Sequence, residues 1–212
     1  MKKVSLAAAM VLCTGLAVAF QPEAPTAPTT PTPPAPVDAH APAVPLLAEH
    51  IELNTKLVGE WTTVTRFWMA PGQEPMESHG KAKFEPIMGA KFVRQTFTGE
   101  MMGTKFNGEG LFGFNAASRE FETTWIDNQT TGIMLTKGTK NAKGEIESTG
   151  EVDNPETGAT ETIRTVLRFD SKTQMTYEMW FKGSDGGEFK ALEVVYTKGT
   201  ASPAPAAPST GK

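Results

Sequence analysis

Cysteine is nearly absent from this 212-residue sequence. The one cysteine, Cys13, lies in a segment that we expect to be removed, so the mature protein would contain none. Its absence excludes disulfides, a thiol nucleophile and cysteine ligands to a metal, although the predicted export would permit disulfides. We therefore expect the hydrophobic core alone to stabilise the fold.

Histidine and catalytic motifs are also scarce. The three histidines are His40 in a Pro-rich tract, His50 in a predicted helix and His79 in a predicted strand, without the spacing of a metal site. The sequence contains no Gly-x-Ser-x-Gly elbow, Walker loop or dinucleotide fingerprint. It therefore predicts no catalytic residue, no metal and no cofactor.

An excess of positive charge is missing as well. The formal net charge is −4, and it becomes −6 if residues 1–20, which carry only Lys2 and Lys3, are removed. A mildly acidic chain is not typical of proteins that bind nucleic acid, so we expect no such partner.

Residues 1–20 have the features of a secretory signal peptide. Lys2 and Lys3 precede an apolar run, and Ala17-Val-Ala19 supplies the small residues that signal peptidase needs. We expect export to the periplasm or the extracellular space. The alternative is lipidation of Cys13, which would anchor the protein to a membrane, but the bulky Leu12 before it disfavours this.

Proline, alanine and threonine dominate residues 21–45, and a shorter tract of the same kind forms residues 199–212. Such segments bury too little apolar surface to fold, so we predict a disordered linker and a disordered tail. The remaining residues, 46–198, have the length of one domain.

Helical periodicity is confined to the start of this domain, in LLAEHIELNTKL. We expect a helix that turns one side to the core, formed by Leu46, Leu47, His50, Ile51, Asn54 and Leu57. His50 would be bonded to backbone or to Asp127.

After the helix, alternating runs are separated by Gly, Pro, Asn or Asp. We predict ten strands, at 60–69, 78–86, 90–99, 104–114, 119–127, 131–138, 144–152, 159–169, 173–182 and 188–198. Sequential hairpins of even spacing favour an all-β antiparallel meander, and closure into an up-and-down barrel would remove its exposed edges. Gly108 and Gly110 would mark a bulge or a close approach of backbone.

Several motifs in residues 46–198 resemble the DUF1579 family, whose function is unknown. They are Glu49-His50 with Leu53, Leu57-Val-Gly-Glu-Trp61, Gly72, Gly113-Phe-Asn115, Trp125-Ile-Asp127 and Gly138. The resemblance implies a calycin-like barrel, similar to lipocalins or fatty-acid-binding proteins, whose closed end Trp61 would plug. It implies no activity.

A ligand site is suggested by FETTWID, in which Phe121, Thr123, Trp125 and Asp127 share one face. An aromatic and a carboxylate on one face fit a ligand wall, although Asp127 also starts a turn, where Asp commonly bonds backbone. Large aromatic and methionine side chains in other strands suit an apolar pocket or a packed core. The residues predicted to bind a ligand are Trp125, Asp127, Phe121, Arg94, Phe92, Tyr177 and Met179.

Arg94 presents two alternatives, because both faces of its strand are mixed. Pointing inward, it would hold the carboxylate of a ligand; pointing outward, it would be a solvated charge. Arg164 and Arg168, in the predicted strand 159–169, should lie outside, since they alternate with the mostly apolar Ile163, Thr165, Leu167 and Phe169.

The leading hypothesis is a non-catalytic barrel that binds a small hydrophobic or amphipathic molecule. One alternative is an enzyme that uses the same cavity with Asp127, His50 or Arg94 as polar groups. Another is a packed barrel that works through its surface as an interaction module.

Overall fold

The computed structural model describes residues 45–154, 158–182 and 186–199. The predicted signal peptide, the linker and nearly all of the tail, with Cys13 and His40, lie outside the described residues. Within those residues, no helix combines the length and the hydropathy needed to cross a bilayer.

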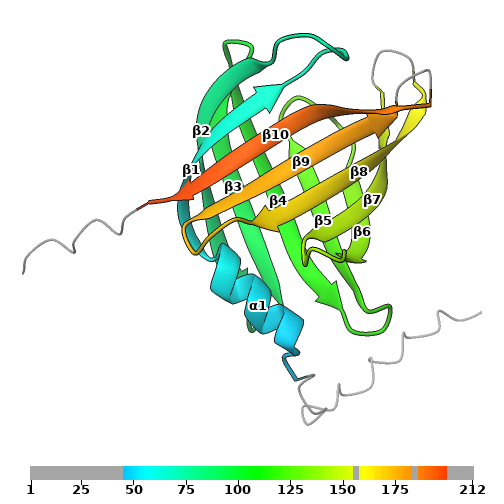
Figure 1. Cartoon of the computed structure of the whole chain (residues 1–212). Helices are drawn as coiled ribbons and strands as arrows, with labels where there is room; N and C mark the ends of the chain where they lie inside the picture. The colour runs from blue at the N-terminus through cyan, green and yellow to red at the C-terminus, as the bar shows by residue number, and fades with distance from the viewer. Residues whose placement is uncertain (1–44, 155–157, 183–185, 200–212) are drawn as a thin grey trace, which may run out of the picture. The chain divides into compact units, whose positions relative to one another are not determined.

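One helix and ten strands make up the described residues (Figure 1). They are α1 (Ala48–Leu57), β1 (Gly59–Phe67), β2 (Met76–Ile87), β3 (Phe92–Met101), β4 (Thr104–Asn115), β5 (Glu120–Asp127), β6 (Met134–Lys140), β7 (Ile146–Asp153), β8 (Thr160–Phe169), β9 (Gln174–Lys182) and β10 (Glu188–Lys198). All ten predicted strands are present.

The strands form one closed antiparallel barrel. Each strand pairs with its neighbours in the chain, and β1 closes the ring by pairing with β10, with Val64 opposite Val195. Closure gives every strand a partner on both sides, except where the ends of β2 and β3 diverge beyond Gly80 and Gly99. The predicted all-β, up-and-down, ten-stranded barrel with an N-terminal helix is confirmed.

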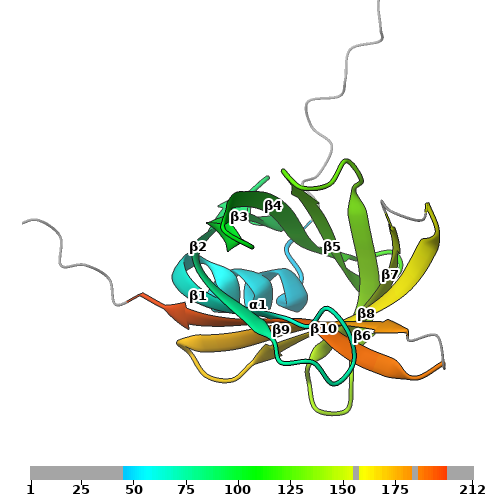
Figure 2. The ribbon, with the colours of Figure 1, turned by 90° about the horizontal axis from the view of Figure 1, so that it is seen from above.

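Helix α1 covers one end of the barrel, which we call the closed end (Figures 1 and 2). Its side chains bond to the β2–β3 turn and to β4: Asn54 Nδ2 donates to the carbonyl of Ala90 at 2.8 Å, and His50 Nε2 lies 3.1 Å from the carbonyl of Phe114. The buried side chains of the helix are His50, Leu53 and Leu57. Ile51, which was expected to face the core, is 55% exposed, because the contact stripe falls at positions 50, 53 and 57.

Trp61 plugs the closed end as expected. It is 2% exposed, and its Nε1 donates to the carbonyl of Leu57 at 2.8 Å. Its ring meets Phe84 and Tyr196 edge to face, with centroids 6.4 Å apart in both cases. The Gly-x-Trp segment thereby joins the helix to the core of the barrel.

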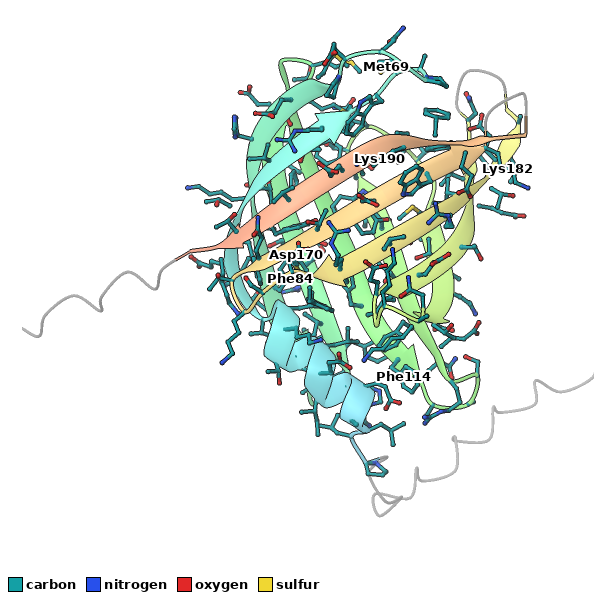
Figure 3. The ribbon with its side chains drawn as sticks, in the orientation of Figure 1. Met69, Phe84, Phe114, Asp170, Lys182 and Lys190 are labelled. Carbon is teal, nitrogen blue, oxygen red and sulfur yellow. The ribbon has the colours of Figure 1, made fainter. Side chains whose placement is uncertain are left out.

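The half of the barrel nearest α1 is packed. An internal cavity bordered by Leu53, Phe112, Phe121 and Leu167 measures about 10 Å³, which is room for about one water molecule. Phe84 and Phe114 lie at this end, whereas Met69 lies at the opposite end, which we call the mouth (Figure 3). This part of the interior therefore has room for nothing much larger than a water molecule.

Candidate functional site

Trp125 lies flat against the inner face of β4, over two glycines. A Cβ atom on Gly108 would stand 2.7 Å from Cη2 of Trp125 and closer still to Cζ2. A Cβ on Gly110 would stand 3.1 Å from Cε3 of the same ring. The β4–β5 register is regular here, so the glycines mark no bulge. They instead leave room for the indole ring, and a Cβ on Gly110 would also stand 2.9 Å from the carbonyl oxygen of Thr124.

Two phenylalanines extend this surface. The Phe106 ring is stacked on Trp125, with 6.4 Å between centroids and 16° between planes. Phe97 meets both rings edge to face, at 5.8 Å from Phe106 and 6.4 Å from Trp125. We call Phe97, Phe106 and Trp125 the aromatic panel. It is a continuous apolar surface on the mouth side of the interior.

Asp127 fixes the panel in place. Its Oδ2 accepts a hydrogen bond from Trp125 Nε1 at 3.0 Å. Its Oδ1 accepts from the backbone N–H groups of Gln129 and Thr130, both at 2.9 Å. The carboxylate thus orients the indole and closes the β5–β6 turn, which is the structural role expected of an Asp at a turn.

A cleft of about 880 Å³ opens in the barrel wall beside the panel. The β2–β3 ladder ends at the pair Gly80–Gly99, beyond which β2 continues toward Met76 and β3 toward Met101. We call this opening the wall cleft. It is bordered by Phe67, Met76, Glu77, Ser78, His79, Gly80, Lys81, Thr98, Gly99, Glu100, Met102 and Gly103.

Phe97 separates the wall cleft from the interior. Its ring lies across the glycines at the base of the cleft, since Cβ atoms on Gly80 and Gly99 would stand 2.8 and 3.1 Å from it. Met76 and Met102, which are both exposed, also border the cleft.

Two buried hydroxyls lie behind the cleft. Thr63 and Thr65 of β1 are 2% and 4% exposed, and the Oγ1 atom of each has no hydrogen-bond partner. A Cβ on Gly80 would stand 2.9 Å from Thr63 Oγ1. Such unsatisfied hydroxyls are uncommon in protein interiors and call for an explanation.

The deeper polar groups of the interior do have partners. Gln95 Nε2 donates to Tyr196 Oη at 3.2 Å, and the Tyr177 hydroxyl bonds to Thr165. Burial raises the pKa of Tyr196 to about 12, and burial raises that of Tyr177 further. Both phenols therefore keep their protons at a pH near 10, where an exposed tyrosine begins to ionise.

The other predicted interior residues are divided between the two halves. Phe121 is buried in the packed half near α1, where its ring centroid lies 5.1 Å from that of Phe114. Tyr177 borders the small internal cavity. Met179 faces the interior on β9, opposite Leu192 and two residues closer to the mouth than Tyr177. Of these three, only Met179 lies toward the panel end.

Arg94 and Phe92 do not belong to the interior, which corrects the assignment of both to a ligand site. Arg94 is exposed and its Nη2 bonds to Glu85 Oε2 at 3.3 Å on the outer face. Phe92 is 42% exposed and its ring covers Gly113 from outside. The alternation in β3 correctly predicted which residues share a face, but both faces contain polar and apolar residues, so it did not show which face is inside. Hydrogen bonding of β3 to β2 and β4 places Val93, Gln95 and Phe97 inside the barrel. Arg164 and Arg168 are also outside, as expected, bonded to Glu188 and Asp170.

His50 is fully engaged at the closed end. Its Nδ1 accepts from the N–H of Leu47 at 2.9 Å, and its Nε2 lies 3.1 Å from the carbonyl of Phe114. This is the pattern of a neutral imidazole that donates through Nε2. His50, Asp127 and Arg94 thus lie at the closed end, at the mouth and on the outer face, so the structure does not assemble them into one site. No group of three potential metal ligands occurs among the residues that the structure describes.

The sequence did not single out Phe106, Thr63, Thr65 or Gln95. The period-2 run Trp61, Thr63, Thr65, Phe67 could have indicated that the threonines face inward with Trp61. The glycines of β4 could have indicated a large ring opposite them. Nothing in the local pattern of β3 marked Gln95 as buried.

Comparison with known proteins agrees with this fold. The crystal structure of Rv2717c from M. tuberculosis has 17% sequence identity and a TM-score of 0.53, over 73% of this chain and 99% of the other. The S-type phycobiliprotein lyase CPES from Guillardia theta has 9% identity and a TM-score of 0.51, over 72% and 93%. At these identities the likeness concerns the calycin-like fold alone.

None of the curated proteins compared with this chain matches it. A family model does match, over residues 47–198, which include α1 and all ten strands. The family is described as a protein of unknown function. The chain belongs to the DUF1579 family.

Proposed function

We propose that this barrel binds a small, mostly apolar molecule against the aromatic panel, without catalysing a reaction on it. The observation that carries the proposal is the Trp125 ring, which Asp127 holds flat over two glycines and which packs against Phe97, the ring at the base of the wall cleft. Ligand sites are typically concave and mostly apolar, with a few polar groups that fix orientation. The panel and the buried threonines together have that composition, whereas the rim of the wall cleft is more polar and includes Glu77, Lys81 and Glu100.

The wall cleft is the proposed route of entry. Met76 and Met102 offer flexible apolar surface at its rim, and such side chains adapt to varied hydrophobic shapes. Rotation of Phe97 would connect the cleft to the panel, because this ring covers the glycines at the base of the cleft. The signal peptide expected at residues 1–20 supports binding in an exported compartment.

The test is a titration of the mature protein with fatty acids, fatty alcohols and naphthalene derivatives, followed by tryptophan fluorescence and calorimetry. We expect at least one class to bind with micromolar affinity, about −8 kcal/mol. Trp125→Ala should weaken that binding by about tenfold or more while the protein remains folded, a loss of about 1.4 kcal/mol.

Matched controls come from the outer face. Trp180 is half-buried outside the barrel, with Arg164 5.0 Å above its ring, so Trp180→Ala should leave the affinity unchanged. Arg94→Ala should likewise have no effect, for acids and alcohols alike. If no probe binds to a folded sample, or if Trp125→Ala binds as tightly as the natural chain, the proposal fails.

A further inference from the structure

We infer that the ligand of the aromatic panel is uncharged and carries a hydrogen-bonding group that pairs with Thr63 and Thr65. The inference rests on the proposed function and specifies the chemical class of the ligand. It takes the place of the expectation that an inward Arg94 would select a carboxylate.

The first ground is the pair of unpartnered hydroxyls. A buried hydroxyl without a partner costs free energy, so two of them on one strand are unfavourable in the unliganded barrel. A hydroxyl can donate one hydrogen bond and accept others, which suits an alcohol, a carbonyl or an amide. A ligand of that kind would supply the missing bonds.

The second ground is position. Thr63 and Thr65 share the inner face of β1 with Phe67, which borders the wall cleft. Alternate residues of a strand are about 7 Å apart, so the two hydroxyls lie at successive depths behind that opening. Thr63 Oγ1 and the Phe97 ring meet over Gly80, so a group seated on the panel lies next to the hydroxyl.

The third ground is the absence of a fixed charge among the buried polar residues, since the charged residues that border the wall cleft, Glu77, Lys81 and Glu100, are exposed. The buried polar residues that the structure describes are threonines, one serine, one glutamine and His50, and His50 is engaged at the closed end. No arginine or lysine is among them. The one carboxylate at the panel, Asp127, would repel an anion. A buried carboxylate of the ligand would therefore lose its hydration without gaining a counter-charge.

The experiment compares matched probes at pH 7 by calorimetry on the mature chain. One pair is 2-naphthol and 2-naphthoate, and the other is dodecanol and dodecanoate, so that each pair differs only in the polar group. In each pair that binds, we expect the neutral member to bind about tenfold more tightly or better.

The second arm uses Thr63→Val with Thr65→Val, which keeps the side-chain shape and removes both hydroxyls. We expect the affinity for the neutral probe to fall by about tenfold and the affinity for naphthalene, which has no polar group, to stay the same. The unliganded double variant should melt at the same or a higher temperature. Thr62→Val is the control, because Thr62 lies on the outer face of β1 and bonds to the carbonyl of Thr197.

The outcomes separate the two proposals. If the carboxylates bind as tightly as their neutral partners, or if the double valine variant keeps full affinity for the neutral probe, this inference is overturned while apolar binding stands. If no probe binds to folded protein, both are overturned. If the double variant does not fold, the comparison of probes on the natural chain decides.

Discussion

At the scale of single residues, Trp61 shows how a short motif determines packing. Its indole N–H bonds to the last carbonyl of α1 while its ring fills the space between Phe84 and Tyr196. One side chain therefore connects the helix, the first strand and the core. Gly59 before it has a φ of 137°, a conformation that L residues rarely adopt.

Truncation of this residue gives the first prediction. Trp61→Ala should lower the free energy of unfolding by about 3–5 kcal/mol, because it removes a buried aromatic and leaves a cavity. Urea denaturation followed by circular dichroism measures the loss. Trp180→Ala, on the outer face, should cost much less. A loss below about 1 kcal/mol for Trp61→Ala would show that the packing described for this end is wrong.

The two tyrosines give a prediction about alkaline pH. The chain contains only Tyr177 and Tyr196, and burial raises the pKa of both. Between pH 10 and about 12 the unfolded chain loses the Tyr196 proton while the folded barrel keeps it. Stability is therefore complete below pH 10 and falls as pH rises, by about 1.4 kcal/mol per pH unit and per tyrosine.

The measurement is the ultraviolet absorbance of ionised tyrosine as a function of pH. It reports ionisation directly, without a fit to an unfolding curve. At about pH 11 the native protein should show little of it, and protein unfolded in denaturant should show both residues ionised. In Tyr196→Phe, the free energy of unfolding should fall less steeply with pH above pH 10, because only Tyr177 then contributes to the fall. Ionisation of both tyrosines in the native protein at pH 10 would contradict their burial.

At the scale of elements, β4 and β5 are matched to each other through glycine and tryptophan. Gly110 of β4 is directly opposite Trp125 of β5, and Gly108 is opposite Asp127. The ring lies across the strand that bears the glycines instead of projecting to the barrel axis. The panel is therefore a property of two paired strands, since neither strand alone contains it.

This matching can be tested by a double-mutant cycle. Gly108→Ala should destabilise the barrel by about 1–3 kcal/mol, because its Cβ would overlap the Trp125 ring. In a Trp125→Phe background the same change should cost clearly less, since the smaller ring leaves room for a methyl group. Urea denaturation of the four proteins measures the coupling. Equal costs in both backgrounds would mean that Trp125 does not rest on Gly108.

The two ends of the barrel also differ at this scale. The closed end contains α1, Trp61 and the phenylalanines packed beneath the helix. The mouth contains the fork of β2 and β3, where the ladder ends at two glycines. Binding chemistry is expected where the wall opens, and resistance to unfolding where it is packed.

At the scale of the whole molecule, the chain joins one barrel domain to segments of different composition. We still expect residues 1–20 to be a signal peptide and residues 21–45 a linker, and both segments lie largely outside the described residues. Cleavage after Ala19 should give a mature protein that starts near Phe20 or Gln21. N-terminal sequencing of protein from the exported fraction measures this. A lipid-modified Cys13 at the N-terminus would instead mean that the protein is anchored to a membrane.

The sequence by itself determined the architecture. Ten alternating runs with turn residues between them and one helical segment were enough to predict the barrel and its helix, while the plug at Trp61 was implied by the resemblance to the DUF1579 family. This succeeded because strand alternation and turn chemistry are local properties, read within a few residues. Trp125 was also found in this way, since FETTWID places it on one face with Phe121 and Asp127.

Only the tertiary structure decided what surrounds that tryptophan. Alternation sorts the residues of a strand into two faces, but where both are mixed, as in β3, pairing with neighbouring strands determines which face is inside. Arg94 and Phe92 therefore turned outward, and Gln95 and Phe97 turned inward. The wall cleft, the stacked Phe106 and the unpartnered Thr63 and Thr65 arise from contacts between strands far apart in the chain, which no local pattern encodes.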